Sequence, residues 1–153
     1  MKERTLVILK PDALQRNILG EIISRFERKG LKIIGLKMAN LSDEVLEEHY
    51  AHHKDKPFFS DLKEFMKSSP VILMVLEGLE AVSVVRKMAG STKGFEADMG
   101  TIRGDFALGA RNIIHASDSK ETAKAEIGRF FNEKELFEYH KVMDDILYNP
   151  DEL

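Results

Sequence analysis

His115 is the residue whose type and surroundings most readily suggest chemistry. It ends a short apolar run, and Ser117-Asp118-Ser119, a segment that could cap the start of a helix, follows shortly after it. A histidine between a strand end and a helix start could act as a nucleophile if one ring nitrogen is unprotonated and correctly aimed. On position alone, the plainer alternative is favoured, in which a partly buried histidine bonds a backbone carbonyl.

Three features around His115 favour the chemical role. The glycine-rich segment 91–111, which also carries basic residues, leads straight into it, and loops of this length are usually functional or disordered. Asn112 lies just before it in the chain. Glu126, on the helix expected next, could hold one ring nitrogen and leave the other unprotonated.

A second group of histidines raises a metal-site hypothesis. His49 and His53 stand at i, i+4 spacing on an expected helix, with His52 between them and Asp55 close by. Two histidines at that spacing can share a helix face and bind zinc. However, the H-E-x-x-H arrangement is absent, and the local sequence is typical of a solvated helix end. We therefore expect no metal site here, and His140 is most simply a surface residue.

The sequence contains neither of the common glycine-rich phosphate-binding motifs. There is no G-x-x-x-x-G-K-[ST], and no G-x-G-x-x-G follows an expected strand. If this protein handles nucleotides, it must therefore hold their phosphates with side chains.

The elements that must position these residues alternate between strand and helix. Strands are expected at residues 5–10, 31–41, 71–76 and 112–115. Helices are expected before Gly30, from Ser42 to Tyr50, between Pro57 and Ser69, from Gly78 to Gly90, from Ser117 to Phe131, and from Asn132 towards Leu147. Gly35 hints at a bulge or a close backbone approach, and the apolar run 71–76 predicts a central strand. We predict an α/β (α+β) sandwich of ferredoxin-like type, a four-stranded antiparallel sheet with helices packed on it.

Length and composition limit the classes of protein. The 153 residues fit one domain, 1–153, ending in an irregular tail from residue 148. The net charge of -3 argues against a nucleic-acid backbone as the main partner. The absence of cysteine excludes disulfides and fits a reducing cytosol. No apolar stretch approaches the roughly 20 residues of a membrane span, so we expect a cytoplasmic protein with no membrane partner.

Residues 112–118, Asn-Ile-Ile-His-Ala-Ser-Asp, resemble the active-site signature N-x-x-H-G-S-D of nucleoside diphosphate kinases. Other segments resemble family segments in the family's order: residues 9–12 (Leu-Lys-Pro-Asp), His49-Tyr50 with residues 56–59 (Lys-Pro-Phe-Phe), Glu77-Gly78, and residues 100–106 (Gly-Thr-Ile-Arg-Gly-Asp-Phe). The resemblance covers nearly the whole chain. Several matches in order are more specific than one heptapeptide, and they favour the catalytic interpretation of His115.

The resemblance implies a ping-pong phosphotransferase. The γ-phosphoryl group of ATP or another nucleoside triphosphate would pass to a nucleoside diphosphate through a phosphohistidine at His115. Glu126 would hydrogen-bond the imidazole, Ser117 would support Glu126, and Tyr50 would stand beside the histidine. Mg²⁺ is expected as the cofactor, held mainly by substrate phosphates and water rather than by protein ligands.

The resemblance also implies a set of residues that hold the phosphates. These residues are Lys10, Arg86, Thr92 and Arg103. Phosphoryl transfer requires in-line positioning and positive charge around the phosphate oxygens, which cationic donors supply. The structural alternative is that Lys10 is only a strand-end charge and that the arginines pair with acids such as Glu80 or Asp105.

The sugar and the base would be held by further matching residues. Lys10 and Asn112 would reach the ribose 3′-hydroxyl. Phe58 would stack on the base, with Leu62 and Ala110 bordering the same slot, although Phe58 and Leu62 could instead be core residues. Stacking accepts any base, so the resemblance implies broad base tolerance.

The sequence departs from the family pattern at three places close in sequence to the residues expected to act. Ala116 replaces the glycine that usually follows the histidine. Residues 106–112 form a segment one residue shorter than in many relatives, which leaves the Ala110 side of the slot open to question. The loop 93–99 lacks prolines that are common where family subunits pack. The family is oligomeric, and we expect a homo-oligomer, with a hexamer favoured over a tetramer.

Two other classes of function remain as alternatives. A catalytically silent relative would bind nucleotides or proteins through the same fold, but it has no evident need for the full set of matching polar residues. A ferredoxin-like nucleic-acid-binding module would call for a basic sheet face with exposed aromatics, whereas the net charge is negative and the strands carry few aromatics.

Overall fold

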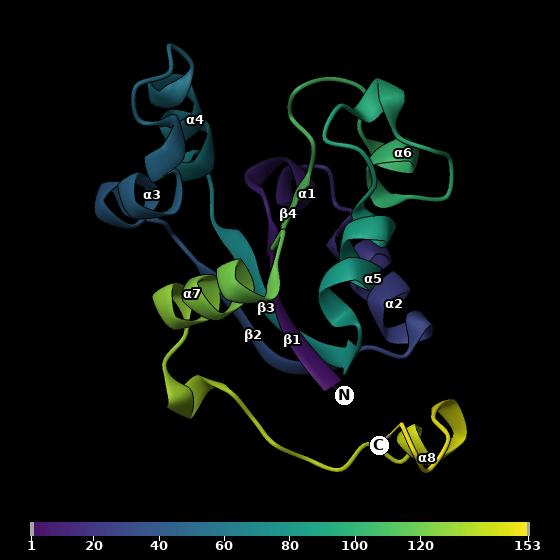
Figure 1. Cartoon of the computed structure of the whole chain (residues 1–153). Coiled ribbons are helices and arrows are strands. Elements are labelled where there is room, and N and C mark those ends of the chain that lie inside the picture. Colours follow the sequence, from purple (N-terminus) through teal and green to yellow (C-terminus); the bar gives the residue numbers. More distant parts are fainter. Residues whose placement is uncertain (1, 153) are drawn as a thin grey trace.

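The computed structural model describes residues 2–152 and has a four-stranded sheet at its centre (Figure 1). The strands are β1 (Lys2–Leu9), β2 (Lys32–Ala39), β3 (Val71–Leu79) and β4 (Ile114–Ala116). They lie in the order β2-β3-β1-β4, and each neighbouring pair is antiparallel. With helical connections from β1 to β2 and from β3 to β4, this is the ferredoxin-like arrangement, so the predicted α+β fold is confirmed. Positions 1 and 153 of the predicted domain lie outside the described residues.

Helices cover both faces of the sheet. One core contains residues of α2 (Leu19–Lys29), α5 (Ala81–Ala89) and α6 (Ile102–Phe106). The other contains residues of α3 (Asp43–His49), α4 (Phe59–Lys67) and α7 (Lys120–Phe130). The shorter elements are α1 (Pro11–Gln15), α8 (Asp144–Leu147) and 3-10 turns at Ala51–His53, Gly94–Glu96 and Glu133–Glu135. Over residues 2–152, no helix is long and apolar enough to cross a membrane.

The interior strands separate the two cores. Along β1, Leu6 and Ile8 point into one core while Val7 and Leu9 point into the other, and all four are fully buried. Successive strand side chains point to opposite faces, so a strand buried on both faces has no solvated position. This is why residues 6–9 of β1 and residues 71–76 of β3 are continuous apolar runs, and the predicted central place of residues 71–76 is confirmed. Burial of each such side chain contributes about 1.5–3 kcal/mol.

Local capping signals set several helix boundaries. The Ser42 hydroxyl accepts a hydrogen bond from the Val45 amide at the start of α3, and Ser119 does the same for Thr122 at the start of α7. Gly30 ends α2 with a φ of 100°, a left-handed conformation that glycine adopts without a steric cost. The predicted starts of α3 and α7 and the predicted end of α2 are confirmed.

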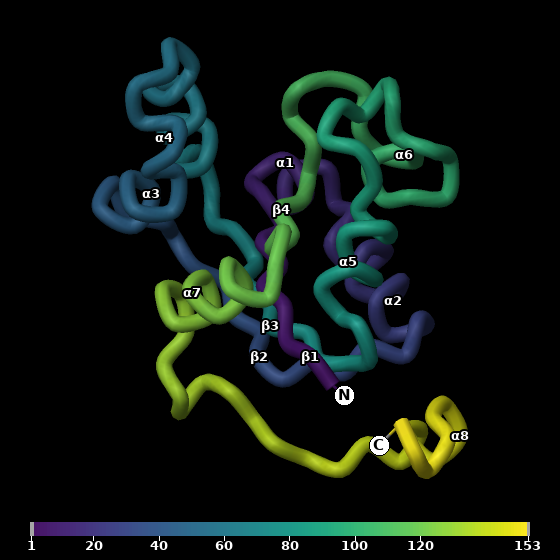
Figure 2. Tube along the Cα trace, in the orientation of Figure 1, coloured from purple at the N-terminus to yellow at the C-terminus, as the bar shows by residue number. Residues whose placement is uncertain are grey.

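The prediction of a final helix over residues 132–147 is wrong. The capping box of Asn132 and Glu135 is present, but it supports only one 3-10 turn. The chain then crosses one end of the sheet before reaching α8, as Figure 2 shows. On the way, the Phe137 amide donates to the Ile34 carbonyl and the Tyr139 hydroxyl donates to the Ile33 carbonyl. Partners offered by β2 therefore replace the hydrogen bonds that a continued helix would have made.

The prediction of one long loop over residues 91–111 is also wrong. The segment contains α6, which Thr101 caps by accepting from the Gly104 amide. Its glycines hide the helical periodicity, and only Ile102 among the residues of α6 is buried. The last strand begins at Ile114 rather than at Asn112, because Asn112 and Ile113 form a turn that leads into it.

The bulge predicted at Gly35 is confirmed. The pairing of β2 with β3 shifts register between Ile33 and Gly35. A Cβ at Gly35 would lie 2.9 Å from Leu136 Cδ2 and 3.0 Å from Phe131 Cε1. Gly35 thus allows the chain after α7 to lie close against β2.

Replacement of Gly35 by valine is expected to lower the free energy of unfolding by about 1–3 kcal/mol, because the new side chain overpacks the contact with Phe131 and Leu136. Urea unfolding would measure this change. Gly20→Ala is the control, since a Cβ at Gly20 meets no atom within 4 Å. It should leave stability unchanged or raise it by up to about 1 kcal/mol. A Gly35→Val protein as stable as Gly20→Ala would contradict the close packing.

Candidate active site

A cavity of about 660 Å³ lies where the C-terminal half of α3, the end of α5, the loop after it and β4 meet α7. Eight of the residues expected to act in catalysis or nucleotide binding line it: Lys10, Tyr50, Arg86, Thr92, Arg103, Asn112, His115 and Glu126. They come from segments more than 100 residues apart in the sequence. The fold therefore brings together at one place most of the polar groups that the sequence suggested for chemistry.

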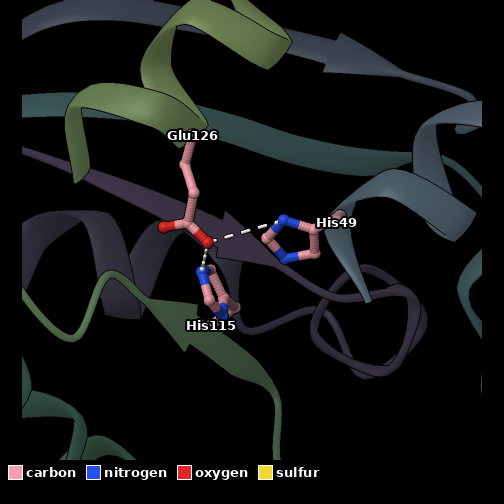
Figure 3. Close-up of side chains that lie close together, drawn as sticks. All are labelled: His49, His115 and Glu126. Atoms are coloured by element: carbon pink, nitrogen blue, oxygen red, sulfur yellow. Dashed lines mark hydrogen bonds and ion pairs between the residues drawn. The ribbon is translucent and has the colours of Figure 1, made fainter. Parts of the chain in front are cut away.

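His115 is held by Glu126 inside this cavity. Its Nε2 lies 2.8 Å from Glu126 Oε2, as Figure 3 shows. Ser117, which is fully buried, donates from its hydroxyl to Glu126 Oε1 at 2.6 Å and accepts from the Leu6 amide at 3.2 Å. Both carboxylate oxygens are thus engaged, and Ser117 ties Glu126 to β1. The predicted places of Glu126 beside the imidazole and of Ser117 behind Glu126 match this geometry.

These contacts decide the protonation state of the site. Burial alone would raise the pKa of Glu126, but the hydrogen bond and charge of His115, the Ser117 hydroxyl and the charge of His49 lower it overall. A carboxylate only accepts hydrogen bonds, so Nε2 of His115 must carry the proton. In a neutral imidazole the other nitrogen, Nδ1, then keeps its lone pair.

A strained turn places His115 relative to Asn112. The Ile114 amide donates to the Asn112 carbonyl at 2.7 Å, which closes a three-residue γ-turn around Ile113. Ile113 has a φ of 73°, a conformation that costs a β-branched residue roughly 1–3 kcal/mol. Its amide donates to Asp12 Oδ2 at 3.0 Å, its carbonyl accepts from the Lys10 amide at 2.8 Å, and its side chain is fully buried. These contacts hold the turn, and the side chains of Asn112 and His115 both reach the cavity.

Lys10 is one of the positively charged residues that line the cavity. It stands at the end of β1, before α1, and its Nζ donates to Asn112 Oδ1 at 2.8 Å. Asn112 Nδ2 in turn donates to the Thr92 carbonyl at 2.8 Å. Burial, with the repulsion of Arg103, lowers the pKa of Lys10 to about 8, although Asp12 acts to raise it. Lys10 is therefore a fixed member of the cavity wall rather than a free strand-end charge.

Arg103 is held by backbone carbonyls. Its three nitrogens donate to the carbonyls of Gly90, Asn112 and Ile114 at 2.9, 3.2 and 2.5 Å. The alternative pairing with Asp105 is wrong, because Asp105 Oδ2 lies 2.6 Å from Arg25 Nη2. Burial, followed by the charge of Arg86, lowers the pKa of Arg103 to about 10.

Arg86 is exposed on α5, and among the ion pairs formed within residues 2–152 none involves it or Glu80. Lys10, Arg86 and Arg103 thus place three positive groups around the cavity, close enough for Arg86 and Lys10 each to interact with Arg103. Such a concentration of positive charge suits phosphate oxygens.

His49 is the residue that sequence reasoning misplaced. The sequence suggests a role for it only as a metal ligand with His52 and His53 and places it in a segment that resembles the family, yet it is buried against His115, with ring centroids 4.7 Å apart. Its Nδ1 lies 3.0 Å from Arg129 Nη1 and 3.5 Å from Glu126 Oε2. A cation at hydrogen-bond distance from the same nitrogen opposes a metal ion among these groups. The regular spacing from Val45 and Leu46 on an apolar helix face was the available signal for its burial.

The residues expected to hold the base do not line the cavity. Phe58 is 48% exposed and lies beside His53, with ring centroids 5.2 Å apart. Leu62 is partly buried against one of the two cores, and Ala110 is exposed on the loop before Asn112. The expectation that Phe58 could be a core residue is wrong, whereas Leu62 does contact the core.

Tyr50 stands at the cavity wall with its hydroxyl buried and without a hydrogen-bond partner among the described residues. Its ring contacts His49 edge-on, with centroids 4.7 Å apart. Burial, helped by the charge of Glu126, raises the pKa of the phenol, so it remains a neutral donor near pH 7.

The family model for nucleoside diphosphate kinase matches residues 3–136. This chain belongs to the nucleoside diphosphate kinase family. It is 57% identical to the nucleoside diphosphate kinase of Pyrococcus horikoshii over 146 residues, which covers 93% of each chain. The predicted activity, transfer of a phosphoryl group between nucleotides, is thereby confirmed for the family to which the chain belongs.

Solved structures of nucleoside diphosphate kinases have folds similar to that of this chain. A Halobacterium salinarum nucleoside diphosphate kinase in complex with CDP has a TM-score of 0.95 and 41% identity, covering 97% of this chain and 100% of that one. A Borrelia burgdorferi nucleoside-diphosphate kinase with bound vanadate and ADP, described as a transition state mimic, has a TM-score of 0.86 and 34% identity, covering 94% of this chain and 95% of that one.

The lowered pKa of Lys10 predicts an alkaline limb in the pH profile. Lysine is charged below its pKa, so the positive charge is lost as the pH rises through about 8 instead of 10.5. We expect kcat/KM, which reports the free enzyme, to fall above about pH 8. The Lys10→Met enzyme should be less active by about 10- to 100-fold and should lack this limb.

Lys87→Met is the matched control, because Lys87 is exposed on α5 and does not line the cavity. Steady-state kinetics from pH 6 to 10 would measure both variants. An alkaline limb that persists unchanged in Lys10→Met would show that another group causes it.

Proposed function

We propose that this nucleoside diphosphate kinase moves the γ-phosphoryl group of a nucleoside triphosphate to a nucleoside diphosphate through a phosphohistidine at His115. The observation that carries the proposal is the contact between His115 Nε2 and Glu126, which leaves Nδ1 as the nucleophile. Among the hydrogen bonds of residues 2–152, none other involves the His115 ring.

The first half-reaction forms a nitrogen–phosphorus bond. The lone pair on His115 Nδ1 attacks the γ-phosphorus, and the bond from phosphorus to the β–γ bridging oxygen breaks. The diphosphate leaves with that electron pair. The ring gains positive charge, and the Glu126 carboxylate stabilises it through the proton on Nε2. The second half-reaction reverses these steps, with the terminal phosphate oxygen of another diphosphate as the attacking atom.

Lys10, Arg86 and Arg103 are proposed to hold the phosphates. Arg103 commits one N–H from each of its three nitrogens to carbonyls, so two of the five N–H groups of a guanidinium remain for phosphate oxygens. Arg86 and Lys10 would add charge on either side, and the Thr92 hydroxyl would donate one further hydrogen bond. Because the backbone fixes Arg103 before substrate binds, little ordering is needed at the moment of transfer.

The sugar is proposed to contact Lys10 and Asn112, whose side chains are hydrogen-bonded to each other. Tyr50 is proposed to donate a hydrogen bond from its hydroxyl beside the His115 ring. The buried, unpartnered Tyr50 hydroxyl supports this role.

The chemistry of the donor set supports Mg²⁺ held by substrate. Of the acids that line the cavity, Glu126 has both oxygens engaged and Glu48 pairs with Arg129, which leaves Asp118. The other charged residues of the wall are the cations Lys10, Arg86, Arg103 and Arg129, so one free carboxylate cannot form a protein cage for a dication. When bound to the phosphate oxygens and water, the ion would neutralise charge on the nucleotide. No side chain is proposed as its direct ligand.

Broad base tolerance is also part of the proposal. The two structural relatives bind a pyrimidine nucleotide, CDP, and a purine nucleotide, ADP. The half-exposed ring of Phe58 is free to stack on a base, and Leu62 and Ala110 are proposed to border the slot. Recognition by stacking discriminates little between bases.

Three further predictions remain untested. A homo-oligomer, with a hexamer favoured, is supported by exposed apolar side chains such as Leu36 and Met38 on β2 and Phe95 and Met99 in the loop after α5. A native-mass measurement giving a monomer or a tetramer would contradict the hexamer. The single domain over residues 1–153 and the cytoplasmic location stay predictions.

The covalent shuttle can be tested by mixing the protein with γ-labelled ATP and Mg²⁺ and then denaturing it. We expect an acid-labile, base-stable label that passes to added GDP and is absent from His115→Ala. His140→Ala is the control, since the His140 side chain is 70% exposed and lies outside the cavity lining. Folded protein that binds ATP without taking the label would favour the silent relative instead.

A further inference from the structure

Arg129 and His49 form a contact that the reaction as described does not use. Arg129 lies one helical turn after Glu126 on α7, and both side chains line the cavity. Arg129 Nη1 is 3.0 Å from His49 Nδ1. A guanidinium can only donate, so His49 Nδ1 must accept, and the proton of the neutral ring must be on Nε2.

The same nitrogen of His49 also lies near Glu126. His49 Nδ1 is 3.5 Å from Glu126 Oε2, the oxygen that accepts from His115 Nε2 at 2.8 Å. If His49 Nδ1 carried a proton, it would donate to this oxygen and compete with His115 for it. Arg129 prevents that competition, because its N–H occupies the lone pair of Nδ1 and its charge opposes an imidazolium.

His49 also limits the orientation of the nucleophile. Its ring stands edge-on to the His115 ring, with an interplanar angle of 82° and centroids 4.7 Å apart. His49 is itself packed edge-on against Phe130, with centroids 5.2 Å apart. On its other side, Arg129 forms an ion pair with Glu48, whose Oε1 lies 3.2 Å from Arg129 Nε. Residues of α3 and α7 therefore together hold the His49 ring.

We propose that Arg129 and His49 are positioning residues: Arg129 holds His49 as the neutral Nε2–H tautomer, so that the Glu126 carboxylate serves His115 alone. Neither residue needs to touch the nucleotide for this role. The inference rests on the proposed function of His115, because it concerns what keeps Glu126 available to that ring.

The electrostatic surroundings of His49 agree with this assignment. Its titratable neighbours are Glu126 and Arg129 on α7, His115 on β4, Glu48 and Tyr50 beside it, and His52 on the following 3-10 turn. Burial, followed by the charge of His115, lowers the pKa of His49 to about 3, with Glu126 acting to raise it and Arg129 to lower it further.

The first test uses the wild-type protein and requires no catalysis. ¹⁵N–¹H NMR of the imidazole groups at pH 7 should show His49 with an unprotonated Nδ1 and a proton on Nε2, with no titration between pH 5 and 8. A protonated Nδ1, or titration within that range, would overturn the proposal whether or not His115 takes up phosphate.

The second test compares Arg129→Met with Lys124→Met, which removes the same charge from an exposed position of α7. In Arg129→Met, the pKa of His49 should rise by about one unit or more, since a donor and a nearby positive charge are lost. Without the Arg129 donor, the neutral His49 ring can also carry its proton on Nδ1 and compete for Glu126, so kcat should fall at every pH while KM stays within about twofold of the wild type. Lys124→Met should change neither the titration of His49 nor kcat.

Two further variants separate positioning from a general loss of structure. Arg129→Gln keeps an amide donor and should retain the tautomer of His49 with a smaller loss of kcat. Arg129→Met combined with His49→Phe removes the competing nitrogen and should return kcat towards its wild-type value. A raised KM, an unchanged His49 tautomer in Arg129→Met, or no recovery of kcat in the double variant would refute the positioning role.

Discussion

The hydrogen bond between Glu126 and His115 is the interaction on which the rest of the site depends. It assigns the proton to Nε2 and therefore leaves the lone pair of Nδ1 available for the attack that we propose. Burial raises the free energy of an unpaired carboxylate, so Glu126 remains charged only because His115 and Ser117 occupy both of its oxygens. Ser117 accepts a hydrogen bond from the backbone of β1, and this connects the protonation state of His115 to the central sheet.

The backbone around β4 supplies the second constraint. Ile113 stays in a costly left-handed conformation because Lys10, Asp12 and the core hold it there. Arg103 then binds the carbonyls of Asn112 and Ile114, on either side of that turn. Arg103, which we propose binds phosphate, and the strand that carries His115 are thus parts of one hydrogen-bonded unit. In our proposal, this unit holds the phosphates with side chains in place of a glycine-rich phosphate loop.

The sequence predicted the fold well where the local signal was strong, as in the continuous apolar run of β3 and in the helices that Ser42 and Ser119 cap. The prediction failed where contacts with distant parts of the chain outweighed local signals. After Glu135, the chain donates hydrogen bonds to carbonyl groups of β2 instead of continuing as a helix. For the site, the resemblance named the residues that meet in the cavity, but spacing alone could not show that Arg103 binds carbonyls instead of Asp105. Nor could it show the contact of His49 with Arg129, which joins two helices distant in sequence.

The most direct test of the central claim is to locate the phosphoryl group on the ring of His115. The phosphorylated protein, prepared with ¹⁵N-labelled histidine, would be examined by NMR correlations that connect phosphorus to each ring nitrogen. Our account expects phosphorus on Nδ1 and a proton on Nε2 bonded to Glu126. Phosphorus on Nε2 would contradict it, because that nitrogen could not then donate to the carboxylate.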